Sequence, residues 1–166
     1  MILIQNGRVL DPVTNTDQVM DVLLDESGIV KTGEHLEAEG ADVIDASGLV
    51  VAPGLMDAHV HFRDPGLTYK EDIFTGAAAA ARGGFTTVVC MANTKPTVDN
   101  VETLNLVQEK GEKALIHVLQ AAAISKGLKG EELTDMEALA EAGAAGFTDD
   151  GIPLMDEKLI MSAMEK

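Results

Sequence analysis

The stretch of sequence that decides the fold is PGLMDAHVHFRDPG, residues 53–66. A strand-like run at 55–62 follows Pro53-Gly54, a pair that interrupts regular secondary structure. Side chains at positions i and i+2 of a strand lie on the same face. If the extended conformation persists through residue 63, four polar side chains share one face: Asp57, His59, His61 and Arg63. We expect the other face, which is apolar, to pack into a protein core.

Strand-like and helix-like segments alternate after this stretch. Apolar, partly β-branched runs predict three further strands, at 86–91, 114–120 and 144–148. Capping-box spacing predicts helix starts at Thr68–Glu71, Asp99–Glu102 and Thr134–Glu137, and Asp156 predicts a fourth start. Four βα units in succession indicate an α/β fold built on a parallel sheet.

The residues before this stretch have a different texture, with short apolar runs separated by polar turns that contain glycine. Ile2–Ile4 and Val9-Leu10 flank Asn6-Gly7, a pair typical of a two-residue hairpin turn. Asp25–Gly28 is a further predicted turn. We therefore divide the chain into a β-rich segment, 1–52, and a βα region, 53–166.

Composition and charge exclude several classes of protein. The 166 residues are 46% hydrophobic and 24% charged, which predicts a folded chain rather than a disordered one. The net charge is -16, from 12 Lys+Arg against 28 Asp+Glu, which argues against nucleic acid and anionic membranes as partners. A small anionic substrate is compatible with this charge, because one local arginine outweighs the distant charges at contact distance.

Cysteine usage and hydropathy indicate a cytoplasmic protein. The single cysteine cannot form a disulfide within the chain, which fits a reducing compartment. The start of the sequence does not resemble a signal peptide, and no apolar run reaches the roughly 18 residues that span a bilayer.

The His59-x-His61 pair predicts a metal site. Two imidazoles on one face of a strand can supply two ligands to a divalent metal, and zinc suits nitrogen donors of this kind. The pair lies at the end of the first strand of the βα series, where loops at carboxyl ends of strands build functional sites. Asp57 is a candidate acceptor for a histidine ring N–H.

Three downstream motifs extend the pattern: GGFTT at 83–87, NTKP at 93–96 and FTDDG at 147–151. Together with residues 53–66, they resemble the bacterial class I dihydroorotases of the amidohydrolase superfamily. The resemblance covers the whole chain. It implies a (β/α)8 TIM barrel, of which this chain would hold the first half, and an N-terminal segment that belongs to a composite β-sandwich. It also implies reversible hydrolysis of (S)-dihydroorotate to N-carbamoyl-L-aspartate in pyrimidine biosynthesis.

The resemblance assigns roles to individual residues. It implies that His59, His61 and Asp150 hold one or two Zn²⁺ ions, with Asp150 rather than Asp149 as the bridging carboxylate. It implies that Arg63 and Asn93 bind the substrate carboxylate. No catalytic residue is assigned, because the proton-shuttling aspartate and the later histidine ligands of the family would lie after Lys166. The last predicted helix also reaches Lys166 without a stop signal, so we expect a larger domain and an inactive isolated piece.

Other interpretations stay open from the sequence. One is another cyclic amidohydrolase, an allantoinase or a hydantoinase, against which Arg63 and Asp150 count. Another is a non-catalytic subunit that scaffolds aspartate carbamoyltransferase, against which the intact His59-x-His61 pair counts. A metal-free structural domain is the third, and a homodimer is compatible with all of them. Three residues have simpler expected roles: His117 packs in a strand, His35 is solvated and Cys90 is a buried, inert thiol.

Overall fold

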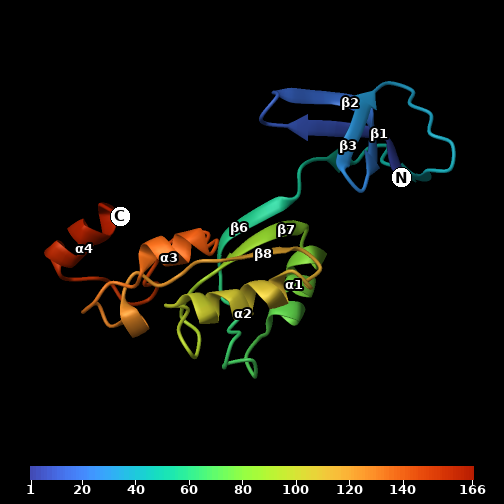
Figure 1. Ribbon diagram of the computed structural model, residues 1–166. Coiled ribbons are helices and arrows are strands. Elements are labelled where there is room, and N and C mark those ends of the chain that lie inside the picture. Colours follow the sequence, from blue (N-terminus) through green and yellow to red (C-terminus); the bar gives the residue numbers. More distant parts are fainter. The chain divides into compact units, whose positions relative to one another are not determined.

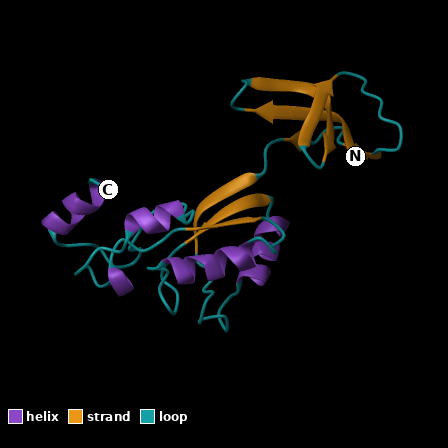
Figure 2. Cartoon of the chain, in the orientation of Figure 1, coloured by secondary structure: helices purple, strands orange, loops and turns teal.

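The computed structural model describes residues 1–166, which divide into two compact units, Met1–Pro53 and Gly54–Lys166. Figure 1 gives the order of the elements, and Figure 2 distinguishes helices from strands. The first unit contains strands and no helix, whereas the second combines strands with helices. None of the helices combines the length and the apolar character that a membrane span requires.

The first unit is one five-stranded sheet. Its strands are β1 (Ile2–Asp11), β2 (Thr16–Asp25), β3 (Gly28–Gly33), β4 (Asp42–Asp45) and β5 (Val50–Val51). The order is β3-β2-β1-β4, and β5 also pairs with β1. Neighbours β1–β2 and β2–β3 are antiparallel, while β4 and β5 run parallel to β1. The turn predicted at Asp25–Gly28 lies between β2 and β3, as expected.

The predicted hairpin at Asn6-Gly7 is wrong. Strand β1 continues through both residues, and its register with β2 shifts between Ile4 and Gly7. Asn6 has a φ of 62°, and its N–H donates to Asp21 Oδ1 at 2.9 Å. A Cβ on Gly7 would lie 2.5 Å from Cγ2 of Val51. Asparagine tolerates a positive φ and glycine has no side chain, which makes Asn-Gly common in hairpin turns. The same two properties allow Asn6-Gly7 to form a β-bulge here.

The second unit contains a three-stranded parallel sheet with helices between its strands. The strands are β6 (Leu55–Val60), β7 (Phe85–Cys90) and β8 (His117–Gln120), in that order across the sheet. The helices are α1 (Ile73–Arg82), α2 (Val101–Gly111), α3 (Met136–Glu141) and α4 (Glu157–Met164), and η1 (Lys126–Leu128) is a short 3₁₀ helix. Both strand pairs are parallel, which confirms the predicted α/β arrangement.

The core of this unit lies between the sheet and the helices α1 and α2, which Figure 2 shows together on one side of the strands. Ile73, Val88 and Leu104 are fully buried there. Gly76 lets α1 approach the strand end, because a Cβ at this position would lie 2.4 Å from the Phe62 ring. Phe62 follows β6 and is buried in this core. Residues of the other parity, such as His59, therefore lie on the opposite face of the strand.

Three of the four predicted helix starts are displaced. The structure caps α1 with Asp72, α2 with Asn100 and α3 with Asp135, whereas α4 starts after Asp156 as predicted. Thr68 and Glu71 do not cap α1, because the backbone before Asp72 forms turns in which Leu67 N–H donates to Arg63 and Lys70 N–H to Leu67. A neighbouring Asp or Asn caps equally well, which sequence spacing alone does not resolve.

The predicted fourth strand, 144–148, is reduced to a single parallel bridge between Ala122 and Phe147. Backbone hydrogen bonds from Ala145 to Gln120 and from Thr148 to Ala122 nevertheless hold this segment beside the continuation of β8. The third strand is also shorter than predicted, because it begins at His117 instead of Ala114. His117 is exposed, so its predicted packing role is wrong.

Candidate metal centre

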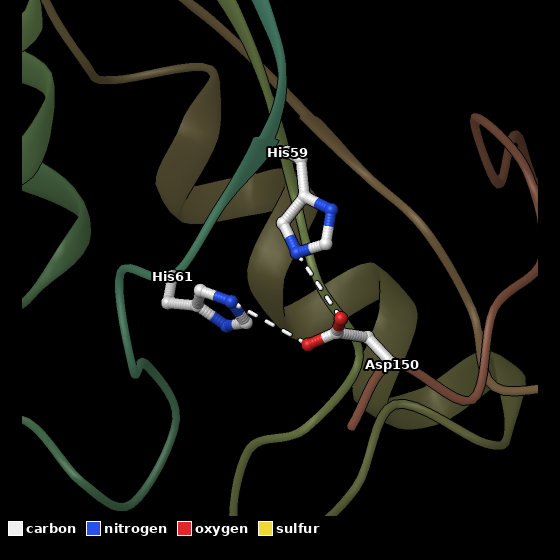
Figure 3. Close-up of side chains that lie close together, drawn as sticks. All are labelled: His59, His61 and Asp150. Carbon is white, nitrogen blue, oxygen red and sulfur yellow. Dashed lines mark ion pairs between the residues drawn. The ribbon is translucent and has the colours of Figure 1, made fainter. Parts of the chain in front are cut away.

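Two histidines and one aspartate converge at the carboxyl end of β6. His59 belongs to β6, His61 follows its last residue, and Asp150 comes from the segment after the Ala122–Phe147 bridge. Nε2 of His59 lies 3.2 Å from Oδ1 of Asp150, and Nε2 of His61 lies 3.4 Å from Oδ2 (Figure 3). One potential ligand atom from each residue lies within 4.8 Å of the others.

The adjacent carboxylates of Asp149 and Asp150 have different partners. Oδ1 of Asp149 accepts the N–H groups of Ile124 at 2.7 Å and Ser125 at 3.0 Å, and Oδ2 accepts the Ser125 hydroxyl. Asp149 is buried, so these bonds satisfy a carboxylate that water does not reach. Asp149 therefore ties two loops together, while Asp150 faces the histidines.

Asn93, in the loop after β7, contacts three of the other four site residues. Its Nδ2 donates to Oδ2 of Asp150 at 3.1 Å. Its Oδ1 lies 3.0 Å from Nδ1 of His61 and 3.5 Å from Nη1 of Arg63. All five site residues expected from the sequence are thus brought together, although they come from three separate segments of the chain.

The loop that carries Arg63 is fastened by contacts that the sequence analysis missed. Asp64 is buried and pairs with Nζ of Lys110 at 2.6 Å. Pro65 accepts the Lys95 N–H at 3.0 Å, and a Cβ on Gly66 would lie only 1.7 Å from the Lys95 carbonyl oxygen. The Asp64-Pro65-Gly66 sequence signals a tight turn, but it does not identify a partner on a helix 46 residues away.

Three further expectations from the sequence have different outcomes. Asp57 makes no hydrogen bond to a histidine ring, and its Oδ1 accepts the backbone N–H of His59 at 3.0 Å instead. Cys90 is buried as predicted, and burial raises the pKa of its thiol to about 12, which favours the unreactive protonated form. His35 is exposed in a loop, as predicted.

The converging donors fit a divalent metal ion. Two imidazole nitrogens and a carboxylate oxygen are ligands that zinc and similar metals accept. A cation between these atoms would be attracted by the Asp150 charge and by the lone pairs of both rings. The side chains of His61 and Asp150 are 29% and 22% exposed, so an ion can reach them from solvent.

Comparison with family models matches residues 48–166 to the family described as Dihydro-orotase-like. The chain belongs to this dihydroorotase-like family. The family implies a metal, which agrees with the donor set at His59, His61 and Asp150.

Curated relatives of the chain are named dihydroorotase. A protein named dihydroorotase from Clostridioides difficile is 63% identical over 167 residues, and one from Streptococcus pneumoniae is 58% identical over 166 residues. Both alignments cover 100% of this chain, but 40% and 39% of the respective relatives. The chain thus spans about 40% of the length of the curated relatives it matches.

Solved structures agree with the family's fold. A D-hydantoinase matches 98% of this chain with a TM-score of 0.75 and 28% identity, covering 36% of its own length. The L-hydantoinase of Arthrobacter aurescens matches 98% of this chain with a TM-score of 0.75 and 20% identity, covering 37% of its own length. A solved dihydroorotase matches 89% of this chain with a TM-score of 0.64 and 19% identity, covering 42% of its own length. The last two show the fold alone, and together the three confirm the amidohydrolase-type α/β fold.

Proposed function

We propose that the gene product containing this chain is a zinc-dependent dihydroorotase, which reversibly hydrolyses the cyclic amide of (S)-dihydroorotate to N-carbamoyl-L-aspartate in pyrimidine biosynthesis. The observation that carries the proposal is the position of Arg63, whose guanidinium lies beside Asn93 in the same cluster as His59, His61 and Asp150. A fixed cation next to a metal site suits a ring that bears a carboxylate. Relatives named dihydroorotase at 54–63% identity support the same conclusion.

Each site residue has a chemical task in this proposal. His59, His61 and Asp150 would hold the metal, which lowers the pKa of a bound water and polarises a carbonyl. The planar guanidinium of Arg63 offers a carboxylate two parallel hydrogen bonds and thereby fixes the ring's orientation. Asp57 accepts the His59 N–H and Asp149 accepts the N–H groups of Ile124 and Ser125, and neither carboxylate joins the three converging ligand atoms.

Purified gene product tests the proposal directly. We expect bound zinc, turnover of dihydroorotate, and little turnover of hydantoin, a ring without the carboxylate. Zinc-containing protein that hydrolyses hydantoin but not dihydroorotate would show a hydantoinase instead. The D-hydantoinase match at 28% identity is the observation behind that alternative, whereas the charge of Arg63 and the relatives named dihydroorotase at 54–63% identity argue against it.

The cellular setting is also part of the proposal. A biosynthetic role and a single buried cysteine fit the cytoplasm. A homodimer, or a complex with aspartate carbamoyltransferase, would be detected by light scattering and by co-purification. Metal-free protein that co-purifies with the transcarbamoylase and lacks hydrolase activity would identify a scaffolding subunit.

A further inference from the structure

We propose that Asn93 is a positioning residue for the metal ligands, because it selects the tautomer of His61 and orients Asp150. This role is additional to the substrate contact that the family resemblance implies for Asn93. It rests on the metal site of the proposed function, but on neither the substrate nor the reaction.

The orientation of the Asn93 amide is determined by its neighbours. Oδ2 of Asp150 can only accept a hydrogen bond, and it lies 3.1 Å from Nδ2. The Arg63 guanidinium can only donate, and its Nη1 lies 3.5 Å from Oδ1. Rotating the amide by 180° would place an acceptor against the carboxylate and a donor against the guanidinium. Both contacts therefore select the same orientation.

This orientation determines where His61 carries its proton. Oδ1 of Asn93 lies 3.0 Å from Nδ1 of His61, and because Oδ1 is an acceptor, Nδ1 must be the protonated nitrogen. In the neutral ring, Nε2 then has a free lone pair, and it is Nε2 that lies 3.4 Å from Oδ2 of Asp150. Asn93 thus presents the ring nitrogen nearest Asp150 in the form that binds a metal.

The Asn93 backbone is held firmly enough to transmit this constraint. Ala92 is 1% exposed, and its carbonyl accepts N–H groups from Thr94 and Val98. The Met91 N–H donates to Val60, at the end of the strand that precedes His61. The loop after β7 is therefore fastened to the end of β6, the strand that contains His59 and leads into His61. Asn93 and His61 keep their spacing because both are attached to β6.

Zinc affinity of the gene product, measured by competition with a chelator, tests the role. We expect Asn93→Ala to weaken zinc binding roughly 10- to 100-fold, as loss of partners to metal ligands typically does. The cobalt-substituted variant should also show a changed d–d absorption spectrum. Asn105→Ala, at an exposed position on α2, is the matched control and should retain the affinity of the unchanged protein.

A comparison with Arg63→Met separates positioning from substrate contact. That variant should raise the KM for dihydroorotate and leave zinc affinity within about twofold, whereas Asn93→Ala should lower zinc affinity before substrate is added. Unchanged zinc affinity in Asn93→Ala, with only KM raised, would overturn the inference. Unchanged protein that binds no zinc would instead refute the proposed function.

Nitrogen-15 NMR of the unchanged, metal-free protein provides a test that does not depend on folding of a variant. We expect the His61 resonances of a neutral ring protonated at Nδ1 at a pH where the imidazole is uncharged. A ring protonated at Nε2 would contradict the inference whatever the variants do.

Discussion

Nζ of Lys110 lies 2.6 Å from Oδ1 of Asp64, whose side chain is only 4% exposed. Asp64 follows Arg63 directly, and Lys110 belongs to the last turn of α2. The pair therefore fastens the loop that carries the proposed substrate-binding arginine to a helix in the core. A carboxylate this well buried needs its partner, because an unpaired buried charge is strongly unfavourable.

Replacing Lys110 should consequently be destabilising. We expect Lys110→Met to lower the free energy of unfolding of the gene product by about 2 kcal/mol, less than for a fully buried pair because the lysine is 35% exposed. Urea unfolding followed by circular dichroism measures this. Lys126→Met breaks the exposed Lys126–Glu132 pair and should have little effect. Equal losses in both variants would show that burial of Asp64 is unimportant.

Substitution of Arg63 tests the substrate charge. Hydrogen bonds to charged groups are worth about 1.5–3 kcal/mol, so Arg63→Met should reduce kcat/KM for dihydroorotate roughly 10- to 100-fold. Arg63→Lys should recover only part of the loss, because an ammonium lacks the planar fork. Steady-state kinetics provide the measurement. A Met variant with unchanged kcat/KM would place the substrate carboxylate elsewhere.

Removal of the converging ligands should abolish tight metal binding. His61→Ala or Asp150→Ala deletes one of the three donors within 4.8 Å of one another, so the purified variants should contain little zinc by elemental analysis. His117→Ala removes an exposed histidine on β8 and should keep its zinc. Equal zinc in His61→Ala and unchanged protein would mean that the ion binds at another site.

The sequence was sufficient for features that depend on local pattern. Alternation along residues 55–62 predicted His59 and His61 on one face, and the βα order predicted the parallel sheet. The same alternation did not foresee that β6 ends at Val60 and that Arg63 has a φ of 58°. The misplaced hairpin at Asn6-Gly7 shows the limit, because the same backbone preference serves a bulge once β2 pairs across it. The Asp64–Lys110 pair and the Asn93 contacts depend on which segments meet in space, and no local pattern encodes that meeting.

Burial of Cys90 predicts both its reactivity and a dependence of stability on pH. With a pKa raised to about 12 from 9.0, the folded thiol should resist iodoacetamide at pH 8 and react after unfolding in urea. Because the folded state keeps the proton more tightly, stability should fall as pH rises above about 9. Cys90→Ala should remove that part of the dependence. Rapid labelling of folded protein would contradict the assigned burial.

The isolated 166-residue chain should self-associate and should not hydrolyse dihydroorotate. Strand β6 pairs only with β7, so its other edge offers unpaired backbone groups next to Leu55 and Met56, whose side chains are 55% and 57% exposed. An exposed apolar edge of this kind favours strand pairing between two copies of the chain, through β6 of each. No further carboxylate or imidazole joins the three ligand atoms of His59, His61 and Asp150 within 4.8 Å, so we expect the site of this chain to lack a proton-transfer partner. Light scattering and an absorbance assay measure the two properties, and a monomeric, active chain would show that residues 1–166 form a complete site.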